Sequence, residues 1–148
     1  MTAKHVRVTF HLNPENEQGV KTETVWAAPV DSQAFRIANS PFYVFGISSE
    51  DVVSVQDIDG VLMFQSVLAR GGHSTYRVFL QHGRTIQSPE FKEHWSPISV
   101  LGATFENAND HFISVDIPPS KDIGAIYEFL DQGEQKGIWV FEEGHYGR

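Results

Sequence analysis

The stretch FISVDIPPSKDIGAIYEFLDQGEQKGIWVF, residues 112–141, decides the fold because it contains two periodicities in succession. From residue 111 to 117, the apolar side chains of Ile113, Val115 and Ile117 alternate with others, which predicts a half-buried strand. After two prolines, apolar residues recur at the spacing of one helix face, at Ile123, Ile126, Tyr127 and Leu130. We expect Ser120 to cap this helix, Gly137 to end it, and residues 138–141 to form a final strand.

The preceding segment supplies the partners of this unit. Residues 75–80 predict a strand, and Ser88-Pro89 predicts a helix start, because serine is a good N-cap and proline is tolerated at the first helical position. Pro97 then predicts a kink or two short helical pieces before Gly102. Phe105 marks the next strand. The order is therefore βαββαβ, as in ferredoxin-like folds.

The front half of the chain shows strand patterns and no helical periodicity. Asp59-Gly60 predicts a tight hairpin turn, and a polar connection covers residues 13–19. We expect an antiparallel β-sheet or a partly open small barrel, since curling hides strand edges. The predicted strands cover residues 6–12, 22–28, 35–37, 51–56 and 61–70.

The expected fold class is therefore α+β, with residues 1–72 as an antiparallel β subdomain and residues 73–148 as a ferredoxin-like subdomain of one compact unit. The 148 residues are enough for an ordinary core, and the absence of cysteine excludes disulfides and thiolate metal sites. Residues 1–7 lack the apolar region of a secretory signal, and no apolar run approaches the ~20 residues that cross a bilayer. We expect a cytoplasmic protein that does not contact membranes.

The net charge of -8 is unevenly distributed. Residues 1–84 contain eight acids and seven bases, a charge of -1, whereas residues 85–148 contain eleven acids and four bases, a charge of -7. A negative surface repels nucleic acid and attracts a basic protein, although it can also serve solubility alone. The candidate partner-binding residues are Asp116, Asp122, Glu128, Asp131, Glu134, Glu142 and Glu143.

Three further patterns bear on catalysis or on metal binding. In Gly72-His73-Ser74-Thr75 an imidazole stands beside a hydroxyl, but the second glycine of a nucleophile elbow is missing, so a structural turn is favoured over a catalytic or ligand site at His73 and Ser74. The seven histidines lack metal-ligand spacing, and Asp57-Ile58-Asp59-Gly60 lacks the later ligands of a calcium loop. We therefore expect no metal, no cofactor and no nucleic-acid partner.

Several short segments carry a family resemblance along nearly the whole chain. They are Val25-Trp26-Ala27, Gly46-Ile47-Ser48 with Asp51-Val52-Val53, residues 72–78 (GHSTYRV), Val115-Asp116-Ile117-Pro118-Pro119 and residues 137–144. Through them the chain resembles an uncharacterised bacterial family, a domain of unknown function found in proteobacteria and actinobacteria, from whose pattern it departs at Pro97. The resemblance supports the architecture and implies no activity.

Small, acidic, cysteine-free bacterial proteins of this kind are similar to immunity proteins, which neutralise toxins by covering a basic active site. By this analogy the expected function is non-enzymatic binding of a basic protein, such as a secreted or polymorphic toxin domain. One alternative is a small-ligand-binding protein or hydrolase that uses the His73 region. Another is a housekeeping protein whose acidity serves only solubility.

Overall fold

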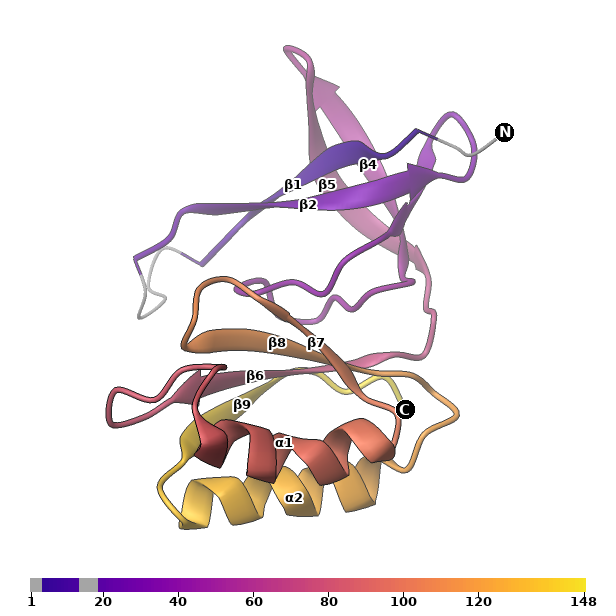
Figure 1. Ribbon diagram of the computed structural model, residues 1–148. Helices are drawn as coiled ribbons and strands as arrows, with labels where there is room; N and C mark the ends of the chain where they lie inside the picture. The colour runs from indigo at the N-terminus through magenta and orange to yellow at the C-terminus, as the bar shows by residue number, and fades with distance from the viewer. Residues whose placement is uncertain (1–3, 14–18) are drawn as a thin grey trace.

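The computed structural model describes residues 4–13 and 19–148, and it contains two sheets and two helices in these ranges. Figure 1 shows three layers: the strands of the front half, a second sheet below them, and both helices on the far face of that second sheet. The α+β class expected from the sequence is confirmed. The predicted connection over residues 13–19 lies largely outside the described residues.

The front sheet consists of β1 to β5, in which consecutive strands pair antiparallel. β1 also pairs in parallel with β5, at Val8↔Leu62 and Thr9↔Met63, so each strand has two neighbours. Asp59 and Gly60 adopt φ angles of 54° and 87°, and the hairpin turn expected there is present. The strands are β1 (Val6–His11), β2 (Thr22–Pro29), β3 (Ala34–Ile37), β4 (Val52–Ile58) and β5 (Val61–Ala69).

The back half follows the chain order expected from the sequence: strand, helix, two strands, helix, strand. Its sheet has the strand order β7-β8-β6-β9, and all neighbouring strands are antiparallel. The front sheet ends and the back sheet begins on either side of residue 72. The elements are β6 (Ser74–Leu80), α1 (Pro89–Val100), β7 (Thr104–Asn107), β8 (Phe112–Ile117), α2 (Ile123–Gln135) and β9 (Trp139–His145).

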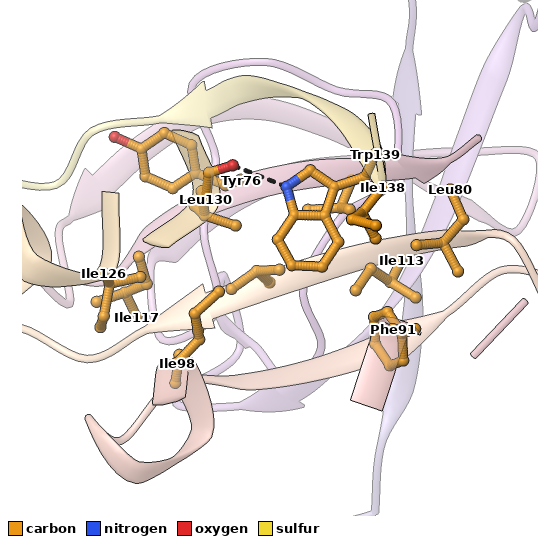
Figure 2. Packing of buried hydrophobic residues seen from close by; sticks show 13 residues of the cluster. Tyr76, Leu80, Phe91, Ile98, Ile113, Ile117, Ile126, Leu130, Ile138 and Trp139 are labelled. Atoms are coloured by element: carbon orange, nitrogen blue, oxygen red, sulfur yellow. Dashed lines mark hydrogen bonds between the residues drawn. The ribbon is translucent and has the colours of Figure 1, made fainter. Parts of the chain in front are cut away.

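The helices bury an apolar core against one face of the back sheet. Trp139 is 0% exposed, and its indole Nε1–H donates to the carbonyl of Leu130 on α2 at 2.8 Å, as Figure 2 shows. Gly133 permits this approach, because a Cβ atom there would overlap the indole ring. Phe91 and Ile98 from α1 complete the packing below β8.

One expectation about the helices was wrong, and one of the two alternatives expected at Pro97 is excluded. The cap of α2 is Asp122, whose Oδ1 accepts the Ala125 N–H at 3.0 Å, and not Ser120. The helix α1 is a single element that contains Pro97, and it does not divide into two pieces. Proline removes one backbone donor in the last turn of the helix, and the burial of Phe91 and Ile98 on either side of it keeps the helix continuous.

Two expectations about the strands also need correction. The final strand does not stop at residue 141, since β9 continues to His145 and includes Glu142 and Glu143. In β8 the alternation does not separate a buried from an exposed face, because Phe112 and Ser114 are buried as well as Ile113. The second face of the back sheet is covered by the front half of the chain.

Candidate functional site

The most polar buried region of the molecule lies where this second face meets the front half. We call it the junction, and it links the two sheets through side-chain hydrogen bonds. Ser114 Oγ on β8, for example, contacts Ser40 Oγ at 2.9 Å and donates to the carbonyl of Pro41 at 2.7 Å. The junction comprises Glu23, Ser40, Ser48, Thr75, Arg77, Ser114 and His145.

Two opposite charges in the junction hold the loop over residues 42–44. The Glu23 carboxylate, on β2, accepts three consecutive backbone N–H groups, those of residues 42, 43 and 44, at 2.6, 2.9 and 2.9 Å. The Arg77 guanidinium, on β6, donates to the carbonyls of Tyr43 and Val44. Consecutive N–H groups form an anion-binding nest, so the loop is held by a carboxylate on its donor side and a cation on its acceptor side.

Arg77 is 0% exposed, which is rare for arginine. Its Cζ lies 4.8 Å from the centroid of the Phe45 ring, and Gly144 packs close to it, since a Cβ at this position would lie only 3.0 Å from Cζ. Burial lowers the pKa of Arg77, whereas the charges of Glu23 and Glu142 raise it. Its Nε has no hydrogen-bond partner among the described residues.

A chain of hydroxyl groups ends at an imidazole on the same face. Ser48 Oγ lies 2.6 Å from Thr75 Oγ1 and 2.8 Å from His145 Nδ1. Burial and the neighbouring Arg70 charge lower the pKa of His145, and Asp51 and Glu143 oppose this shift. A serine nucleophile needs such a base, but Ser48 and Thr75 are 0% exposed, so a substrate has no access to them in this conformation.

The His73 region does not form the pair that adjacency in the sequence suggested. His73 Nδ1 lies 2.9 Å from Asp116 Oδ1, while Ser74 Oγ is buried and accepts the Gly147 N–H at 2.9 Å. Burial raises the pKa of Asp116, and the hydrogen bond and charge of His73 oppose the rise. His73 and Ser74 therefore have separate partners.

Six of the seven acidic candidates belong to α2, its cap and the neighbouring strand β9, although Glu142 lies opposite Arg77 in the sheet and so faces the junction. Asp122, Glu128, Asp131 and Glu134 are on α2, and Glu142 and Glu143 are on β9, the strand that α2 packs against. We call these six residues the acidic side. Tyr127 on α2 is 46% exposed, and its ring centroid lies 5.4 Å from that of Phe141 on β9. This aromatic contact connects the two elements of the acidic side. Asp116 does not belong to this surface, since its side chain is only 18% exposed and is paired with His73.

Several acidic residues also have structural partners. Asp122 caps α2, Glu134 Oε1 accepts the Phe141 N–H at 3.2 Å, and Tyr76 Oη donates to Glu143 Oε1 at 3.2 Å. Burial and the charge of Glu143 raise the pKa of Tyr76. Glu128 on α2 is exposed to solvent.

Sequence reasoning missed the charged pair Glu23 and Arg77 and the Ser48–His145 contact. Each of these residues sits in a segment with an ordinary strand or turn pattern, and only the fold brings the segments together. The available signal was that Ser48, Thr75 and Arg77 fall within the segments that carried the family resemblance.

Two absences concern the parts of the chain that the structure describes. Residues 4–13 and 19–148 contain no group of three acidic or histidine side chains arranged to hold a metal ion. In the same residues, neither helix is long and apolar enough to cross a membrane.

Comparison with known proteins places the fold and the family. The chain is similar to a hypothetical protein from Neisseria gonorrhoeae of known crystal structure, with a TM-score of 0.83 and 17% sequence identity, over 100% of this chain and 97% of that one. At this identity the likeness concerns the fold alone. No curated protein matches the sequence. Residues 23–141 match a family model that spans both sheets, and the chain belongs to the family described as Domain of unknown function (DUF4265).

Proposed function

We propose that this protein is a non-enzymatic binding module that recognises a basic protein through its acidic side, in the manner of an immunity protein that covers the active site of a toxin. The observation that carries the proposal is the gathering of Asp122, Glu128, Asp131, Glu134, Glu142 and Glu143 on one helix and the strand beside it.

Physical arguments support this use of the surface. Charges of one sign on a surface raise the association rate of an oppositely charged partner, and exposed aromatic groups such as Tyr127 are common anchors at interfaces. Leu130 and Trp139, which lie beneath this surface, are fully buried, so the surface rests on a packed core. By contrast, the hydroxyl of Ser74 in the His73 region is fully buried and offers no accessible nucleophile for the hydrolase alternative.

The proposal includes a finer description of the architecture that supports the surface. We propose a small front barrel, supported by the parallel β1–β5 pairing, and a ferredoxin-like back half, supported by the antiparallel order β7-β8-β6-β9. In this arrangement the acidic side lies along the β9 edge of the back sheet.

The test uses proteins retained from the source lysate by the immobilised chain, followed by association kinetics with the purified partner. Glu128→Lys with Asp131→Lys should lower the on-rate by on the order of tenfold at low salt, with a smaller change at high salt. The matched control, Glu90→Lys with Glu93→Lys, applies the same charge change to α1 and should have a smaller effect. Glu142 is avoided, because a lysine there would face the buried Arg77.

A partner that is itself acidic, or an on-rate that is equally insensitive to salt and to the Glu128 and Asp131 substitutions, would refute the proposal.

A further inference from the structure

The strand β9 forms an edge of the back sheet. Within the described residues it pairs with β6 and with no other strand. An edge strand presents main-chain N–H and C=O groups that can pair with another chain. β9 is seven residues long, which is long enough for an added strand to form several main-chain hydrogen bonds.

The direction of the β9 peptide groups follows from two contacts. The carbonyl of Ile138 points inward and accepts the Gln81 N–H, whereas the N–H of Phe141 points outward and donates to Glu134 Oε1. Because peptide groups alternate along a strand, the N–H of Glu143 also points outward. The edge is therefore covered at Phe141 by one side chain from α2, through a single bond of 3.2 Å.

Resting on the proposed function, we propose that the partner contributes an extended basic segment that adds to the outer edge of β9 as a further strand. In this arrangement the main chain of the segment bonds the outward groups of Phe141 and Glu143 and displaces the Glu134 carboxylate.

Charge complementarity identifies the occupant. Adjacent residues of a strand point to opposite faces, so Glu142 and Glu143 flank the edge on both sides, and the neighbouring helix α2 carries Glu128 and Asp131. A segment with lysine or arginine at alternate positions meets these carboxylates while its backbone pairs with β9. A second copy of this chain would bring the same carboxylates face to face, and like charges that lie opposite each other across strands are destabilising.

The test uses a synthetic peptide in which lysine and threonine alternate, together with the same peptide N-methylated at every second residue, which keeps the charge and removes the donors of one edge. The unmodified peptide should bind, slow the hydrogen exchange of the Phe141 and Glu143 amides, and bind at least about tenfold more tightly than the methylated peptide.

A matched pair of variants tests the displacement of Glu134. Glu134→Gln and Glu134→Ala lose the same charge, but only glutamine keeps an acceptor that can compete for the Phe141 N–H. The alanine variant should therefore bind the peptide more tightly than the glutamine variant.

The outcomes separate the two proposals. Equal binding of both peptides, or no exchange protection at Phe141 and Glu143, would overturn strand addition; the proposed function would stand if Glu128→Lys with Asp131→Lys still slows association of the captured partner. If that charge reversal has no effect on the partner, the proposed function itself fails.

Discussion

The two faces of the back sheet are both buried, but they are buried by different chemistry. On one face, Val78, Ile113 and Trp139 pack among apolar side chains of the helices such as Ile126 and Leu130. On the other, Ser114 and Arg77 make hydrogen bonds to the front half of the chain. The alternating residues of β6 and β8 thus form one apolar interface and one polar interface. In many antiparallel sheets the second face is instead exposed to solvent.

The difference has consequences for specificity. Apolar packing contributes most to stability and tolerates many shapes, whereas a buried polar contact is costly unless each group finds its partner. The junction therefore selects one placement of the 42–44 loop, in which the Glu23 carboxylate meets three N–H groups and Arg77 meets two carbonyls.

The largest loss of stability should come from a substitution in the apolar core between the helices and the back sheet. Leu130→Ala removes a fully buried side chain and leaves a cavity, so the free energy of unfolding should fall by about 2–5 kcal/mol in urea titrations. Glu128→Ala, on the solvent side of the same helix, should change it by less than about 0.5 kcal/mol. Equal effects of the two substitutions would show that this core does not dominate stability.

A smaller effect should measure the coupling across the junction. In a double-mutant cycle, Glu23→Gln and Arg77→Met should be non-additive by about 0.5–3 kcal/mol in the free energy of unfolding, because both side chains hold the same loop. The matched cycle pairs Glu23→Gln with Glu128→Ala, which is distant, and should be additive. Additivity in the Glu23–Arg77 cycle would mean that the two charges act independently.

The smallest effect concerns pH. Burial lowers the pKa of His145 in the folded state, so the unfolded state binds more protons. The neutral imidazole therefore stabilises the fold above the unfolded-state pKa of about 6.5. This stabilisation is lost as pH falls below that value. Wild type should therefore lose stability relative to His145→Gln as pH falls below about 6.5, measured by thermal unfolding. Asp116, whose raised pKa acts in the opposite direction, is present in both proteins and cancels. Parallel pH profiles of the two proteins would contradict the expectation.

Local patterns predicted the elements well where one short-range cause dominates. The helical spacing from Ile123 to Leu130 and the Asp59-Gly60 turn needed no information from distant residues. Ser120 was the wrong cap because two nearby residues could each satisfy the first turn, and Asp122 has the side chain that reaches the Ala125 N–H. Pro97 did not divide α1 into two pieces, since the helix continues through it to Val100.

The acidic side was partly predictable, because net charge and helix spacing can be counted along the chain. Its extension onto β9 was expected as well, since Glu142 and Glu143 were candidates from the sequence, although the strand itself was expected only to residue 141. The burial of Asp116 was missed, because its partner His73 lies 43 residues away in the sequence.

The sequence by itself determined the α+β class, the order of the back-half elements, the negative charge of the back half, and the apolar face of α2. These depend on neighbours within a few residues, where spacing alone specifies geometry. Only the tertiary structure decided that Arg77 is buried against the 42–44 loop, that Ser48 meets His145, and that β9 is an edge strand. Those features depend on contacts between segments far apart in the chain, whose polar groups look exposed until another layer covers them.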